Sequence, residues 1–134
     1  MLTGGCYCGR LRYEVDPPLF HQTNCHCSIC RRTSGAPYVA WFTAVRAAFR
    51  WTAEEPARFA STARARRSFC PVCGTQISFE HRDWPAEIDV TICSLDEPDA
   101  VVPENHIHTA GRPAWVRPGD GLPEYPDYRT EPEP

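Results

Sequence analysis

The chain has 134 residues, is 42% hydrophobic and carries a formal net charge of −3 at pH 7. This length fits one domain with a single hydrophobic core, and the composition is that of a globular chain. The near balance of charge argues against a nucleic-acid-binding protein, which normally carries a basic excess. We expect no membrane association, since the most apolar run, residues 36–45, is far too short to span a bilayer. The first residues lack the pattern of a signal peptide, so we expect a cytoplasmic protein.

Apolar and polar residues alternate along much of the chain, which predicts a mainly β fold. The first strand is expected at residues 9–15. Further strands are expected at residues 38–43, 49–51, 58–60, 66–69, 76–80, 88–92 and 105–109. The one good helical start has Ser28 as its N-cap and Gly35 at its end. The chain is therefore predicted to contain few short helical turns.

Proline is concentrated at the end of the chain. Prolines occupy positions 113, 118, 123, 126, 132 and 134. Such a segment sustains neither a helix nor a central strand. We therefore expect one domain over residues 3–116, followed by a proline-rich tail over residues 117–134 that packs loosely or is disordered.

Cysteine is the most informative residue type in this chain. Eight cysteines lie at positions 6, 8, 25, 27, 30, 70, 73 and 93. An even number could form a disulfide framework, but the chain lacks an export signal and is long enough to fold without such bridges. One- and two-residue spacings let one short loop offer several ligands to one metal ion. We therefore expect metal binding rather than disulfides.

The cysteine clusters fit two zinc ions. Zinc takes four tetrahedral ligands in a structural site, and three protein ligands with one open position in a reactive site. The simplest partition gives a structural site with the ligands Cys6, Cys8, Cys70 and Cys73. Gly9 and Gly74 follow these pairs and allow the tight turn of a metal knuckle. A division into three cysteines plus one from another cluster is also possible, but it leaves a thiolate without a metal.

The second zinc site would consist of Cys25, Cys27 and Cys30. In an extended stretch the first two side chains point the same way, and in a following helical turn the last two share a face. Zinc with three thiolates has a formal charge of −1, which favours binding an external thiol as thiolate over activating water. The alternative is a second structural site that Cys93 or a histidine completes. We expect Cys93 itself to be a small buried hydrophobic residue outside the metal sites.

The histidines near these clusters carry no clear metal signal. His26 lies between two predicted ligands, and an extended backbone would point its side chain away from the metal. His106 and His108 share one strand face, and we expect ordinary surface or edge histidines there.

Two groups of arginines lie near the predicted ligands. Arg31 and Arg32 follow Cys30 directly and could bind the carboxylates of a thiol substrate, or could simply add charge at a helix end. Arg64, Arg66 and Arg67 form a basic run, for which we expect a solvated edge strand.

The chain resembles the glutathione-dependent formaldehyde-activating enzyme family, which also includes the centromere protein V domain. The resemblance covers roughly residues 3–116 in the right order. It rests on Gly5-Cys6-Tyr7-Cys8-Gly9, on the segment from Cys25 to Gly35, on the segment from Phe69 to Thr75, on Ser94-Leu95-Asp96, and on His106-Ile107 with the following Trp115. It implies a mainly β fold of the Mss4-like β-tent type with zinc knuckles.

The resemblance also implies an activity. In this family a four-cysteine zinc site is structural and a three-cysteine zinc site is catalytic, and the matching positions are the two sets named above. The implied reaction is that of a carbon–sulfur lyase, the reversible joining of glutathione and formaldehyde to S-hydroxymethylglutathione. The partners would then be a small thiol, with glutathione as the first candidate, and an aldehyde. The second hypothesis is a non-catalytic, zinc-stabilised binding module or thiol carrier.

Overall fold

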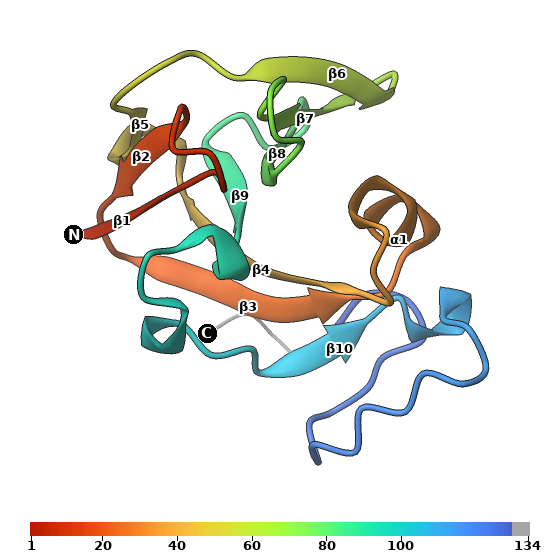
Figure 1. The fold of residues 1–134 in the computed structure, drawn as a ribbon. Coiled ribbons are helices and arrows are strands. Elements are labelled where there is room, and N and C mark those ends of the chain that lie inside the picture. Colours follow the sequence, from red (N-terminus) through yellow and green to blue (C-terminus); the bar gives the residue numbers. More distant parts are fainter. Residues whose placement is uncertain (130–134) are drawn as a thin grey trace.

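The computed structural model describes residues 1–129, which form two β-sheets and one α-helix (Figure 1). The smaller sheet has the strand order β1-β2-β5 and consists of β1 (Leu2–Gly5), β2 (Arg12–Val15) and β5 (Phe49–Trp51). The larger sheet has the order β10-β3-β4-β9-β8-β7-β6. Its strands are β3 (Leu19–Cys25), β4 (Val39–Val45), β6 (Ala57–Thr62), β7 (Ala65–Phe69), β8 (Gln76–His81), β9 (Glu87–Thr91) and β10 (Asn105–Ile107). The prediction of a mainly β fold is confirmed.

The helices are short. Helix α1 (Ser28–Ser34) directly follows β3 and contacts β4. Four 3₁₀ turns complete the helical content of residues 1–129, at Arg46–Ala48, Ile92–Ser94, Pro98–Ala100 and Thr109–Gly111. No helix in this part of the chain has the length and apolar character needed to cross a membrane.

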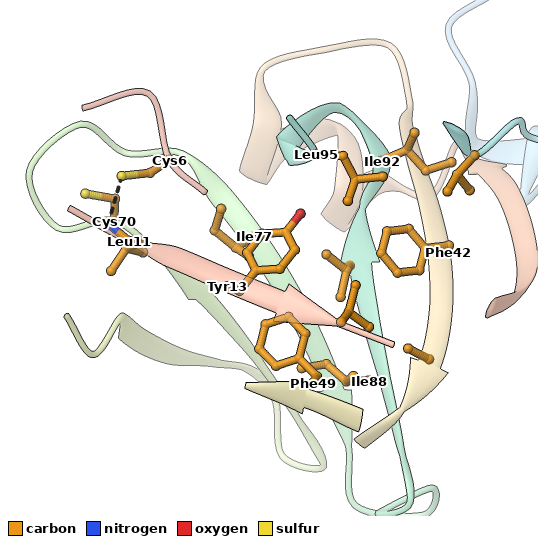
Figure 2. Close-up of a cluster of buried hydrophobic side chains, with 14 residues drawn as sticks. Cys6, Leu11, Tyr13, Phe42, Phe49, Cys70, Ile77, Ile88, Ile92 and Leu95 are labelled. Atoms are coloured by element: carbon orange, nitrogen blue, oxygen red, sulfur yellow. Dashed lines mark hydrogen bonds between the residues drawn. The ribbon is translucent and has the colours of Figure 1, made fainter. Parts of the chain in front are cut away.

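The main core lies between the two sheets. Figure 2 shows Tyr13 of β2 and Phe49 of β5 facing Ile88 of β9 and Phe42 of β4 across this space. Tyr13 is fully buried, its ring stacks on that of Phe49 at a centroid distance of 5.1 Å, and its hydroxyl lies 2.8 Å from Ser94 Oγ. Each such apolar side chain contributes about 1.5–3 kcal/mol on burial. This core fixes the smaller sheet against the larger one.

The opposite face of the larger sheet carries a second, smaller cluster. Trp41 is adjacent to Phe42 in β4, and since successive strand residues face opposite sides, Trp41 points away from the main core. It packs with Cys25, Cys30 and Ile107. Helix α1 therefore places Cys30 on the sheet face that Trp41 occupies.

The segment after residue 116 is attached to the larger sheet. The carbonyl of Pro123 accepts the backbone N–H of His106 at 2.8 Å, and the carbonyl of His106 accepts that of Tyr125 at 2.8 Å. A parallel bridge joins His106 and Glu124. The expectation of a loosely packed tail is therefore wrong for these residues, because their backbone groups pair with the free edge of β10. Pro132 and Pro134 lie outside the described residues.

Candidate metal centre

Four cysteine sulfurs meet where the β1–β2 loop lies beside the β7–β8 turn. The Sγ atoms of Cys6, Cys8, Cys70 and Cys73 all lie within 4.8 Å of one another. Cys8 Sγ is 3.6 Å from Cys6 Sγ and 3.7 Å from Cys70 Sγ. A tetrahedron with zinc–sulfur bonds of 2.3 Å has edges of about 3.8 Å, whereas a disulfide bond is about 2.05 Å long. The sulfur spacing therefore fits a tetrahedral zinc ion.

Two glycine turns build this four-cysteine cluster. Gly9 has φ 84° and donates its N–H to Cys6 O at 3.1 Å, and Gly74 has φ 83° and donates to Cys70 O at 2.9 Å. Nothing lies within 4 Å of a Cβ placed on either residue, so the left-handed backbone alone favours glycine there. The backbone N–H of Leu11 points at Cys6 Sγ, at 3.2 Å. Backbone N–H groups aimed at sulfur stabilise the thiolate form that a metal binds.

The second cluster is built where β3 passes into α1. Cys25 is the last residue of β3, Cys27 precedes the helix and Cys30 lies in its first turn, and their Sγ atoms are within 4.8 Å of one another. The N-cap of α1 is Cys27 rather than the expected Ser28, because Cys27 Sγ accepts the Cys30 N–H at 3.2 Å. The helix ends at Gly35, as expected, with φ 64°. The three sulfurs therefore converge through one strand end and one helical turn.

Protons are shared unequally within the second cluster. The pKa of the Cys27 thiol is lowered, because the thiols of Cys25 and Cys30 and the Cys30 backbone N–H donate to its sulfur, and the charge of Arg67 acts in the same direction. The pKa of Cys25 is raised, because it is the donor to these sulfurs and is buried. Cys27 therefore carries the thiolate when the three sulfurs have no metal. A cation that binds this cluster would displace the protons that remain on the other two thiols.

Arg67 is the site residue that the sequence interpretation missed. It is 4% exposed and its Nη2 donates to Cys30 Sγ at 3.5 Å, whereas a solvated strand was expected. Its neighbour Arg66 is exposed, so the expectation holds for that residue. Alternation along β7 explains the difference, because adjacent side chains face opposite sides of the sheet. No local sequence signal links Arg67 to the second cluster, because Cys30 lies 37 positions away and the two residues meet only in the folded chain.

The two arginines that the sequence offered as substrate ligands, Arg31 and Arg32, form no hydrogen bond to the sulfurs within residues 1–129. Arg32 is exposed, and Arg31 is half-buried with a buried Nε that has no hydrogen-bond partner within residues 1–129. Both lie in the last turn of α1, where positive charge suits the helix end. Their role as carboxylate ligands of a substrate stays a prediction.

A buried histidine pair lies behind the second cluster. His26 points away from the sulfurs, as expected, and its Nε2 lies 2.8 Å from Nδ1 of His106. His106 Nε2 in turn lies 2.8 Å from Asp120 Oδ2. Burial, together with the neighbouring His106, lowers the pKa of His26 to about 4. The expectation of an edge histidine at position 106 is wrong, since the segment around Asp120 covers it completely.

Cys93 lies outside both clusters, as expected. It is exposed rather than buried, because β9 ends at Thr91 and a 3₁₀ turn over Ile92–Ser94 replaces the expected last strand residue. All eight cysteines are free thiols in the structure, which agrees with metal binding rather than a disulfide framework.

The chain is thus a two-sheet β domain with a four-cysteine and a three-cysteine cluster, each of which could hold a metal ion. Residues 1–111 match the model of the family "Glutathione-dependent formaldehyde-activating enzyme". The chain belongs to this family, as the sequence resemblance predicted.

One curated protein and one solved structure show how far the similarity extends. A curated protein of Halomonas elongata with the name "Putative glutathione-dependent formaldehyde-activating enzyme" is 27% identical over 125 residues, which are 87% of this chain and 80% of that protein. A crystal structure of a Rhodobacter sphaeroides protein is similar with a TM-score of 0.62 and 23% identity, and the match covers 92% of this chain and 99% of that one. The second likeness concerns the fold alone.

Proposed function

We propose that this chain is a zinc-dependent carbon–sulfur lyase that acts on an adduct of glutathione, or a similar thiol, with an aldehyde. The observation that carries the proposal is the difference between the two clusters, one with four converging sulfurs and one with three. Membership of the family supports glutathione and formaldehyde as the first substrates to test. Free cysteine thiols also suit a reducing cytoplasm, where we place the protein.

The two clusters would have separate tasks. A structural zinc ion held by Cys6, Cys8, Cys70 and Cys73 would join the β1–β2 loop to the β7–β8 turn. The cluster of Cys25, Cys27 and Cys30 would hold the second ion. With three protein ligands, zinc in this cluster would supply one open position that favours an external thiol in its thiolate form. Arg31 and Arg32, at the end of α1, would meet the carboxylates of that thiol.

The proposed reaction balances without a further reagent. In the lyase direction the C–S bond of the hydroxymethyl adduct breaks and its electron pair stays on sulfur. The hydroxyl group of the adduct loses its proton as the aldehyde carbonyl forms. The sulfur takes up one proton when the free thiol leaves, so the products are the thiol and the aldehyde. In the reverse direction a thiolate attacks the aldehyde carbon and the resulting alkoxide is protonated.

The first prediction concerns metal content and thiol binding. Metal analysis of the purified chain should give two zinc ions per chain. In the cobalt-substituted protein, titration with glutathione should strengthen the sulfur-to-metal charge-transfer band, because a fourth sulfur joins the second cluster. Cys27→Ser should abolish this change, whereas Cys93→Ser should retain it, since Cys93 is exposed and outside both clusters.

Two results would contradict the proposal. A metal count near zero, with disulfides present, would remove both sites. Two bound ions with no spectral change at millimolar glutathione would favour the alternative, a zinc-stabilised binding module. A spectral change without turnover of the glutathione–formaldehyde adduct would favour a thiol carrier over the lyase.

A further inference from the structure

Arg67 is a buried cation in the middle of β7. Its side chain is 4% exposed. Arg64, which precedes β7, is exposed and pairs with Asp83, and Arg66 within β7 is exposed and pairs with Glu80. The three arginines therefore differ in environment although they lie within four positions of one another. Arg67 is the one that points toward the second cluster.

Four side chains hold the guanidinium of Arg67 in place. Nη2 donates to Cys30 Sγ at 3.5 Å, and Nη1 donates to Thr33 Oγ1 at 3.5 Å. The guanidinium carbon lies 5.7 Å from the ring centre of Trp41 and 5.1 Å from that of Phe79, which are cation–π distances. The rings belong to β4 and β8, so the charge is fixed from the sheet as well as from α1.

Arg67 contacts no carboxylate directly within residues 1–129, and the carboxyl group of Asp89 in β9 interacts with its charge only at a longer distance. None of the ion pairs within residues 1–129 includes Arg67, and its Nε is buried without a hydrogen-bond partner in the same part of the chain. A buried cation without a direct ion pair is unfavourable, so a negative group in contact with its guanidinium would stabilise it. Among the hydrogen-bond acceptors of its guanidinium, only the sulfur of Cys30 can carry that charge.

The formal charges show what this pairing does for a fourth ligand. Three thiolates and a divalent ion together have a charge of −1, and an added thiolate would bring the site to −2. The guanidinium reduces these values to 0 and −1. Without Arg67, a second anion would have to enter a site that is already negative and partly buried, where charges interact more strongly than in water.

We propose that Arg67 is a positioning residue that makes the second cluster accept an anionic fourth ligand in preference to a neutral one. The inference rests on the proposed function, since it concerns the open position at Cys25, Cys27 and Cys30. It adds a residue from a distant strand to that site. The ligand it favours is a thiolate, and the interaction needs no carboxylate on the thiol.

The test compares an anionic and a neutral ligand at the cobalt-loaded full chain. The probes are 2-mercaptoethanol, which binds as a thiolate and has no carboxylate, and imidazole, which binds uncharged. Arg67→Met keeps the apolar stem between the two rings but removes the charge, and Arg67→Lys keeps the charge. Arg66→Gln is the matched control, because it removes one positive charge from the adjacent, exposed position of the same strand. Metal content is measured before each titration.

Arg67→Met should weaken thiol binding about tenfold or more and leave imidazole binding within about twofold. Arg67→Lys should restore most of the thiol affinity, and Arg66→Gln should bind both probes as the wild type does. If Arg67→Met does not fold, Arg67→Gln is measured in its place. Equal thiol affinity in the wild type and the charge-free variant would overturn the proposal while leaving the lyase intact.

Other outcomes separate the two proposals further. A parallel loss of thiol and imidazole binding in Arg67→Met would overturn the charge argument in favour of a purely structural role. Thiol binding that depends on Arg67, without turnover of any thiol–aldehyde adduct, would support the role of Arg67 and contradict the lyase. A wild-type protein that binds neither probe would overturn both proposals, because the metal would then have no open position.

Discussion

Asp89 is a carboxyl group that β9 holds partly buried on the same face of the larger sheet as Phe79. It accepts a hydrogen bond from Thr43 Oγ1 at 2.6 Å. Burial raises the pKa of Asp89 to about 6, against the hydrogen bond from Thr43, and the nearby charge of Glu87 acts with burial. The positive charges of Arg67 and Arg129 face it and act in the opposite direction. The protonated form is therefore the one that folding favours.

The raised pKa of Asp89 predicts a pH-dependent stability. An unfolded aspartate titrates near 3.9, so between about pH 4 and pH 6 the folded chain keeps a proton that the unfolded chain has lost. The free energy of unfolding should then fall as the pH rises through this window. Asp89→Asn removes the group, so the wild-type value minus the variant value should decrease from pH 4 to pH 6 and stay constant above that. Denaturant titrations at several pH values measure it, and a pH-independent difference would contradict the assignment.

Two residues, Arg67 and His106, show why the environment of the site was not fully predicted from the sequence. Alternation places Arg66 and Arg67 on opposite sides of a strand, but it does not show that the side of Arg67 is covered by other elements. The cover over Arg67 comes from α1 and from the rings of Trp41 and Phe79. His106 escaped for the same reason, since its partners His26 and Asp120 come from distant parts of the sequence. The cysteines were predicted because their ligand spacing is local.

At the level of elements, the two cysteine clusters connect different parts of the fold, so metal binding at each would contribute differently to stability. The four-cysteine cluster brings together the β1–β2 loop and the β7–β8 turn, which are far apart in the sequence. The three-cysteine cluster ties β3 to the helix that directly follows it. A cross-link between distant elements restricts the unfolded chain more than a local one.

This difference predicts unequal effects of two cysteine variants. Cys70→Ser removes one of four ligands and should lower the free energy of unfolding by at least about 3 kcal/mol, because structural zinc binding contributes directly to folding. Cys27→Ser should cost about 1 kcal/mol and remove only the second metal, since serine is itself a good N-cap for α1. Thermal or denaturant unfolding of the zinc-loaded proteins measures both values. Equal losses would indicate that both clusters are structural.

The strands were predictable where apolar and polar side chains alternate without interruption. The strand expected at 49–51 is found there, and those expected near β4, β7, β8 and β9 differ by one or two residues at their ends. Strand β3 was missed because His21 has φ 54° and the pairing with β4 shifts between Phe20 and Thr23, which breaks the alternation. Strand β1 was missed because it ends in two glycines, which have low β propensity.

For the whole molecule, the family, the mainly β fold and both cysteine clusters followed from the sequence. The path of residues 117–129 could not be predicted from the sequence. Proline excludes a helix and a central strand, but it permits an extended segment that runs along a sheet edge. The segment around Glu124 takes that path beside β10.

The covered edge has a consequence for any shortened form of the protein. Residues 123–125 satisfy backbone groups of His106 that would otherwise be free at the end of the larger sheet, and Asp120 satisfies the buried ring of the same residue. A chain cut after Val116, where the sequence suggested that the domain ends, would expose β10 as an unprotected edge strand. Such an edge is a template for pairing with another molecule, so the shortened chain should self-associate into larger species than the full chain forms. Light scattering after size-exclusion chromatography, with a chain cut after Arg129 as the control, would detect this, and identical elution of all three would show that β10 needs no cover.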